Sequence, residues 1–161
     1  MLKIFRNFKE LDIGKLLLVY EEAFRLSMQK DDIDRYFAEE KFLFYLREDF
    51  FCREHTLMAV WIVADRYVSA LRLEPYEDGF LLSGLETEPA SRRNGYATCL
   101  LQSMIAYAVA ESILPIYVHI HRKNAVSRDL HKKYGFFPLY DFGRLIDGTV
   151  SSVYDTFIFK K

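Results

Sequence analysis

The chain has 161 residues, of which 51% are hydrophobic, and this content is sufficient for a single domain with its own core over residues 1–161. The formal net charge of −1 argues against a general nucleic-acid binder, and no apolar run approaches the length that spans a membrane. Cys52 and Cys99 match no metal-ligand spacing, so we expect free thiols, no metal site and a cytoplasmic protein.

The N-terminal third of the chain predicts one strand and two helices. Met1–Phe5 alternates loosely and suits an edge strand. Apolar residues at helical spacing run through Leu11–Met28 and again through Ile33–Phe51, and the acidic pair Asp31 and Asp32 suits a break followed by a new helix start. The acidic residues of this region either attract a cationic amine or, as charge runs more often do, form a solvated surface.

The middle of the chain predicts three strands followed by a helix. The strands are expected at Leu57–Ala64, Tyr67–Leu73 and Phe80–Thr87, and the helix at Thr98–Ala110. A tight turn at Asp65–Arg66 joins the first two strands. Residues 75–79 have the composition of a loop that leads into the third strand.

The C-terminal third predicts a strand, a helix and a final hairpin. The strands are expected at Pro115–His121, Phe142–Ile146 and Val150–Phe159, with the hairpin turn at Asp147–Gly148. The helix follows Asn124, which suits an N-cap, and ends at Gly135. The whole order predicts an α/β (α+β) fold, in which about four helices flank one mixed, mostly antiparallel sheet of six to seven strands.

The stretch Arg92–Ala97 lies between a predicted strand and a predicted helix. A helix start leaves backbone N–H groups unpaired at the positive end of the helix dipole, so it favours an anion. Gly95 and Ala97 keep the turn uncrowded, and Arg92 and Arg93 add positive charge beside it. The stretch therefore predicts a cradle for a pyrophosphate group.

The spacing Arg-x-x-Gly-x-Ala in this stretch resembles the acyl-CoA-binding signature of the GNAT superfamily of N-acyltransferases. Downstream, Asn124–Phe136 is similar to the last helix of that family, whose usual form is Asn, a spacer and then Leu-Tyr-x-Lys-x-Gly-Phe. The resemblance implies a fold whose fourth and fifth strands splay apart. It also implies transfer of an acyl group from acetyl-CoA to an amine.

The resemblance also implies which residues hold the cofactor. The pantetheine arm is expected to lie between the splayed strands, to pair with the backbone of Leu85 and Thr87, and to contact Asn124. Ser127, one turn further along the helix, either touches the cofactor or is a surface hydroxyl. The pyrophosphate is expected to bind the turn formed by Arg92, Arg93, Asn94, Gly95, Tyr96 and Ala97.

The reaction requires a base that accepts a proton from the attacking amine, because a protonated amine cannot attack a thioester. Glu86 is the first candidate. It lies at the end of an apolar strand, where burial of a charged carboxylate costs free energy, so we expect the residue to have a function there. The alternative is a structural ion pair with Arg72 or another basic residue. His119 and His121, which share a strand face with Tyr117, are second candidates or ordinary hydrogen-bonded residues.

The leaving thiolate must be protonated, and the family commonly places a Tyr directly after the helix Leu for this purpose. Here that position holds His131, and Tyr134 lies three residues further along nearly the same helix face. We therefore expect the acid to be His131 or Tyr134, with water as a third source of the proton.

Three functions compete at this point. The first is an N-acetyltransferase acting on a primary amine of a small molecule or peptide; the second is a non-catalytic acyl-CoA-binding module or sensor. The third is an unrelated domain that binds nucleotide phosphates. Against this function, the chain lacks the glycine-rich motifs that are typical of such domains. A homodimer is compatible with the aromatic excess. No motif identifies the acceptor.

Overall fold

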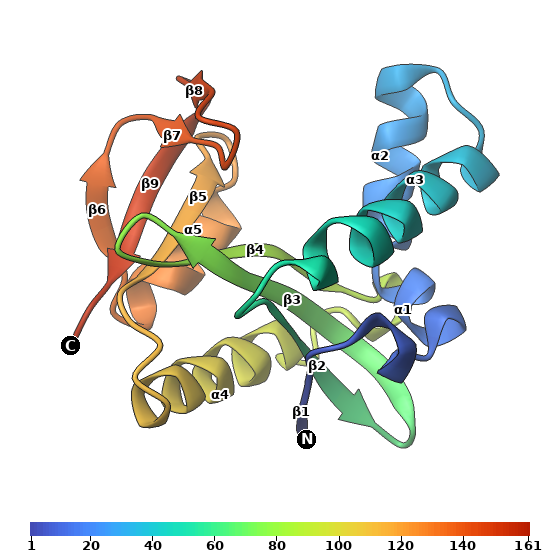
Figure 1. The fold of residues 1–161 in the computed structure, drawn as a ribbon, viewed down its shortest axis with the longest axis horizontal. Coiled ribbons are helices and arrows are strands. Elements are labelled where there is room, and N and C mark those ends of the chain that lie inside the picture. Colours follow the sequence, from blue (N-terminus) through green and yellow to red (C-terminus); the bar gives the residue numbers. More distant parts are fainter.

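A seven-stranded sheet runs through the centre of the protein, and helices cover both of its faces (Figure 1). The structure is a computed structural model that describes residues 1–161. The strands of this sheet are β1 (Leu2–Phe5), β2 (Leu57–Val63), β3 (Arg66–Tyr76), β4 (Gly79–Thr87), β5 (Ile116–His121), β6 (Phe137–Tyr140) and β9 (Tyr154–Phe159). The α-helices are α1 (Ile13–Val19), α2 (Glu21–Asp31), α3 (Arg35–Glu48), α4 (Tyr96–Ala110) and α5 (Ala125–Lys133).

Shorter elements complete the chain. Three 3-10 turns lie at η1 (Phe8–Glu10), η2 (Phe50–Cys52) and η3 (Pro89–Ser91), and a separate two-stranded hairpin is formed by β7 (Gly143–Arg144) and β8 (Val150–Ser151). No helix combines the length and the apolar character that crossing a membrane requires.

The sheet is mixed, with the strand order β1-β2-β3-β4-β5-β9-β6. All neighbouring strands are antiparallel except β4 and β5, which confirms the mostly antiparallel sheet predicted from the sequence. The parallel pairing covers only Phe80–Leu82 against Ile116–Val118. Beyond it β4 continues to Thr87 and β5 to His121 without pairing with each other, so the two strands separate at their carboxyl ends.

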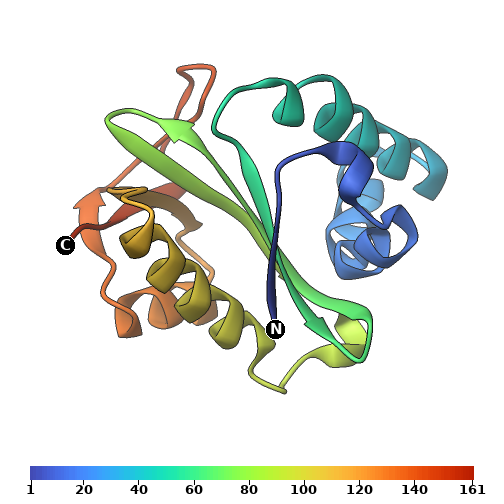
Figure 2. The same ribbon diagram turned by 60° about the horizontal axis from the view of Figure 1, so that its bottom comes forward.

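The hydrophobic core is divided between the two faces of the sheet (Figure 2). On one face, α1, α2 and α3 bury side chains such as Leu16, Phe24 and Leu46 against β2 and β3. On the other face, α4 contributes side chains such as Leu100 and Met104. The two layers fix the positions of the helix ends that surround the separated strands.

The first predicted helix is in fact two helices. The stripe over Leu11–Met28 is interrupted at Tyr20, which ends α1 and precedes α2. Tyr20 is buried, and its hydroxyl donates a hydrogen bond to the carbonyl oxygen of Gly84 at 2.9 Å. The helical period predicts the apolar face correctly, but it carries no signal for this bend, which depends on a contact with a distant strand.

Two other predictions differ from the structure in their bounds, and one strand was missed. The expected loop at residues 75–79 is a short turn, because β3 continues to Tyr76 and β4 begins at Gly79. The expected strand Val150–Phe159 is split into β8 and β9. The strand β6 was not predicted, because Phe137–Tyr140 is a short, exposed edge strand with a proline.

A β-bulge interrupts the pairing of β3 with β4. Arg72 is opposite Ser83, but Ala70 is opposite Glu86, so two residues of β4, Gly84 and Leu85, face one residue of β3. Gly84 has a φ of 58°, a left-handed conformation that favours glycine. The bulge places Glu86 on the sheet face covered by α1–α3, the same face as Ala70.

Candidate functional site

A cavity of about 640 Å³ opens between the ends of β4, α4 and α5, and we call it the turn cavity. Its lining combines the end of β4, the Arg92–Ala97 turn and the start of α5. The lining residues are Leu85, Glu86, Thr87, Arg92, Arg93, Gly95, Tyr96, Ala97, Thr98, Asn124, Val126, Ser127 and Leu130. Nine of the ten residues expected to hold a cofactor therefore lie around one cavity.

The backbone at the start of α4 is open toward the turn cavity. Gly95 is the N-cap with a φ of 77°, and no side chain caps the helix. A Cβ at Gly95 would meet nothing within 4 Å, so this side of the turn is uncrowded. The unpaired N–H groups and the helix dipole together favour an anion here, and the exposed Arg92 and Arg93 add positive charge.

Asn94 is the one expected cofactor residue that does not line the turn cavity. Its side-chain amide donates to the carbonyl oxygens of Ser91 at 3.1 Å and Arg92 at 3.2 Å. Asn94 therefore shapes the turn. On the opposite wall, Asn124 is the N-cap of α5 and accepts a hydrogen bond from the backbone N–H of Ser127 at 3.0 Å.

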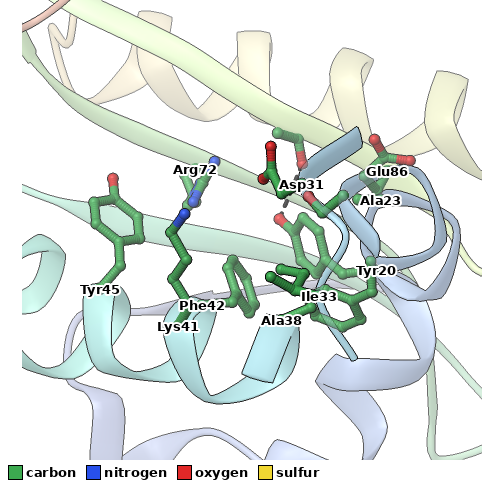
Figure 3. Close-up of a pocket in the computed structure, with 13 residues that line it drawn as sticks. Tyr20, Ala23, Asp31, Ile33, Ala38, Lys41, Phe42, Tyr45, Arg72 and Glu86 are labelled. Atoms are coloured by element: carbon green, nitrogen blue, oxygen red, sulfur yellow. Dashed lines mark hydrogen bonds between the residues drawn. The ribbon is translucent and has the colours of Figure 1, made fainter. Parts of the chain in front are cut away.

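A second cavity, of about 420 Å³, lies between the sheet and the helices α2 and α3, and we call it the aromatic cavity (Figure 3). Its walls are mainly aromatic and aliphatic side chains, with a few charged groups among them. The lining residues are Tyr20, Ala23, Phe24, Ser27, Asp31, Ile33, Ala38, Lys41, Phe42, Tyr45, Arg72, Gly84 and Glu86. Of these residues, the sequence marks only Glu86 as a candidate base and Asp31 as one of several acids that could attract an amine; the aromatic residues carry no such signal.

Glu86 lines both cavities. Burial raises the pKa of its carboxyl group above the ordinary value; the Arg92 guanidinium opposes this rise, Glu22 adds to it, and Arg72 opposes it. Glu86 forms no ion pair with Arg72, and the acids that do pair on this part of the sheet are Glu74 with Arg53 and Glu88 with Arg66. An unpaired carboxylate with a raised pKa, placed where two cavities meet, can accept a proton.

The two candidate acids, His131 and Tyr134, lie outside the lining of both cavities. His131 is 1% exposed, and burial lowers its pKa, so the ring is neutral at neutral pH. Its Nδ1 lies 2.7 Å from the carbonyl oxygen of Ser127, which can only accept, so Nδ1 carries the proton and the buried Nε2 has a free lone pair. In this form, His131 has no proton to give from Nε2.

The strand histidines lie on a different part of the sheet. His119 contacts Thr156 through Nδ1 at 2.9 Å and the carbonyl oxygen of Arg144 through Nε2 at 2.8 Å, and His121 packs against Tyr154. Neither lines the turn cavity or the aromatic cavity. No group of three or more His, Cys, Asp or Glu side chains is arranged to hold a metal ion.

Comparisons with known proteins agree with this architecture. A model of the acetyltransferase (GNAT) family matches residues 19–136, which is more than half of the chain. No curated protein matches the chain.

Solved structures of several acetyltransferases are similar in fold. The PaiA N-acetyltransferase from Thermoplasma acidophilum, in complex with coenzyme A, has a TM-score of 0.68 at 16% identity, over 100% of this chain and 99% of that chain. A ribosomal-protein-alanine N-acetyltransferase from Brucella melitensis has a TM-score of 0.64 at 18% identity, over 98% and 96%. A GNAT family acetyltransferase from Elizabethkingia anophelis with acetyl-CoA bound has a TM-score of 0.56 at 12% identity, over 66% and 76%.

Proposed function

The chain belongs to the GNAT family of acetyltransferases, and from this premise we propose that it moves an acetyl group from acetyl-CoA to a primary amine. The amine belongs to a small molecule or a peptide, and it attacks the thioester directly while both substrates are bound. Cytoplasmic location, a homodimer and a single domain over residues 1–161 stay predictions.

The observation that carries this proposal is the position of Glu86 between the two cavities. A direct transfer needs one space for the acyl donor, another for the amine, and a proton acceptor at their junction. The turn cavity and the aromatic cavity provide the two spaces, and Glu86 is a residue that they share. Neither cavity alone would support a reaction between two bound molecules.

The turn cavity suits acetyl-CoA. The open start of α4 and the two arginines favour the pyrophosphate, and the ends of β4 and β5, which do not pair with each other, leave backbone groups at Leu85 and Thr87 for the pantetheine arm. The similar structures from T. acidophilum and E. anophelis contain coenzyme A and acetyl-CoA, respectively. Their bound molecules support the same donor for this chain.

The chemistry then follows from the charge states of the side chains. Glu86 accepts the proton that the amine must lose. Its raised pKa makes it a stronger base than an ordinary carboxylate, which favours this transfer. The C–N bond forms as the C–S bond breaks, and the thiolate takes up a proton. Tyr134 or water is better suited than His131 to supply it, because burial keeps His131 neutral with its proton held by Ser127.

The test is an assay of free-thiol release from acetyl-CoA with a panel of primary amines, using the wild type, Glu86→Gln and Glu40→Gln. Glu86→Gln keeps the shape but removes the base, so kcat should fall by roughly 10²- to 10⁴-fold. Glu40 is exposed on α3, forms no ion pair and serves as the matched control. Equal activity of the two variants would contradict the assignment of the base. Tight binding of acetyl-CoA without turnover of any amine would favour the sensor.

A further inference from the structure

The aromatic cavity contains an arginine that has no partner. Arg72 extends from β3 into the lining, and its buried Nε makes no hydrogen bond. Arg72 forms no ion pair. The nearby carboxylate of Glu74, two residues along the same strand, pairs instead with the guanidinium of Arg53, with 2.7 Å between nitrogen and oxygen. Buried nitrogen donors in folded proteins nearly always have an acceptor. The acceptor for Arg72 is therefore missing from the protein itself.

Neighbouring groups hold the guanidinium of Arg72 in place without using its donors. Its Cζ lies 5.7 Å from the ring centroid of Phe42 and 5.2 Å from that of Tyr45, so two aromatic rings pack against it. The backbone of Gly84 lies directly beneath, since a Cβ there would come within 2.8 Å of a guanidinium nitrogen. A guanidinium fixed in this way is prepared for a planar anion.

The charges of the aromatic cavity are separated along its length. Arg72 and Lys41 lie toward one end and Glu86 toward the other, with Tyr20 and Asp31 between them (Figure 3). An amine that reaches Glu86 can therefore extend a negative group toward Arg72. The aromatic and aliphatic residues of the remaining walls, such as Phe24 and Phe42, suit an apolar side chain that branches from the carbon between the amine and the negative group.

Building on the proposed function, we propose that the acceptor amine also carries a carboxylate, which binds the guanidinium of Arg72. A carboxylate is planar and singly charged, so it matches one guanidinium through two parallel hydrogen bonds. A phosphate would bring a second negative charge toward Asp31 and Glu86. The substrate class is a free amino acid with an apolar side chain, because a carboxylate at the far end of a long peptide would lie outside a cavity of about 420 Å³.

The experiment compares each amino acid with its primary amide, using L-phenylalanine and L-leucine at saturating acetyl-CoA. Rates are compared for equal concentrations of neutral amine, because the amide has the less basic amino group. The wild type should prefer the acids by roughly 10- to 100-fold in kcat/KM. Arg72→Met should remove this preference, and the loss should appear in KM of the acids. Arg47→Met, on an exposed part of α3, should keep it.

A binding measurement separates this proposal from the proposed function. N-acetyl-L-phenylalanine and its amide are added to the CoA-saturated wild type and to Arg72→Met, and Tm is recorded. If the acid alone raises Tm and Arg72→Met loses the effect, the carboxylate site is supported even when no amine is acetylated. Equal turnover of acids and amides would overturn the carboxylate site and leave the acetyltransferase intact. The carboxylate site is also overturned if neither ligand raises Tm.

Discussion

The turn cavity and the aromatic cavity differ in the groups that they present to a ligand. In the turn cavity the anion site is backbone, since Gly95, Ala97 and Thr98 leave the first N–H groups of α4 open. The aromatic cavity is built from large side chains on α2, α3, β3 and β4. A backbone site recognises a group that never changes, such as a pyrophosphate, whereas side chains can be exchanged to recognise different acceptors.

This difference predicts opposite responses to mutation. The turn cavity should tolerate the loss of side chains and fail when bulk or negative charge is added. The aromatic cavity should fail when one functional group is removed. Glu86, which lines both, should affect both substrates.

Ala97→Glu should have the largest effect among the tests of this contrast. The carboxylate would stand beside the start of α4 and repel the pyrophosphate, so KM for acetyl-CoA should rise by roughly 100-fold. Ala97→Gly removes a side chain instead and should stay close to the wild type. Steady-state kinetics with acetyl-CoA as the varied substrate measures both. A small effect of Ala97→Glu would place the pyrophosphate elsewhere.

The pH profile should show that the two cavities are coupled at Glu86. A base acts only when ionised, so kcat/KM should fall about tenfold per pH unit below the pKa of Glu86. Burial raises that pKa, so the fall should begin at a higher pH than for an ordinary carboxylate. Arg92→Gln removes the cation that most opposes the rise, and the fall should move to still higher pH. An unchanged profile in Arg92→Gln would show that the titrating group is not Glu86.

Tyr20→Phe should weaken the aromatic cavity and leave the turn cavity unaffected. Burial raises the pKa of Tyr20 to about 12, so its hydroxyl stays protonated and donates to Gly84. Removing it leaves a carbonyl oxygen without this donor and should cost about 1 kcal/mol of unfolding free energy. Urea unfolding measures the loss, with the exposed Tyr36→Phe as control. KM for the acceptor should rise and KM for acetyl-CoA should not. The reverse pattern would contradict the assignment of the acceptor to the aromatic cavity and of acetyl-CoA to the turn cavity.

His131→Phe should have the smallest effect on activity. The pKa of His131 is lowered by burial, so the unfolded chain binds more protons below its ordinary pKa of about 6.5, and stability falls as the pH drops through that value. Phenylalanine should reduce this loss only in part, because burial also lowers the pKa of His119. Thermal unfolding between pH 7 and pH 5 records the change. A tenfold fall in kcat would restore His131 as the acid.

The contrast between the cavities also explains what the sequence could predict. Arg92–Ala97 and Asn124–Ser127 are short continuous stretches whose conformation depends on local residues, and they contain seven of the nine expected cofactor residues that line the turn cavity. The sheet was predicted for the same reason, because alternation and turn residues are local signals.

The aromatic cavity could not be predicted, because its residues come together only in the folded protein. Arg72 lies on β3 and Phe42 on α3, and their spacing in the sequence contains no sign of their contact. The bend at Tyr20 depends on the carbonyl oxygen of Gly84, more than sixty residues away. Glu86 could be singled out beforehand, since a charged residue in an apolar strand departs from the local pattern, and Asp31 could be named only as one member of an acidic region.

The close contact between Gly84 and Arg72 has an evolutionary consequence. A side chain at position 84 would push the guanidinium of Arg72 out of its present place, so a change at position 84 affects the function of position 72. Homologues that replace this glycine should carry a shorter or uncharged residue at position 72, and they should acetylate amines without a carboxylate. The pair of residues would then divide the relatives of this chain into two acceptor classes that can be recognised from sequence alone.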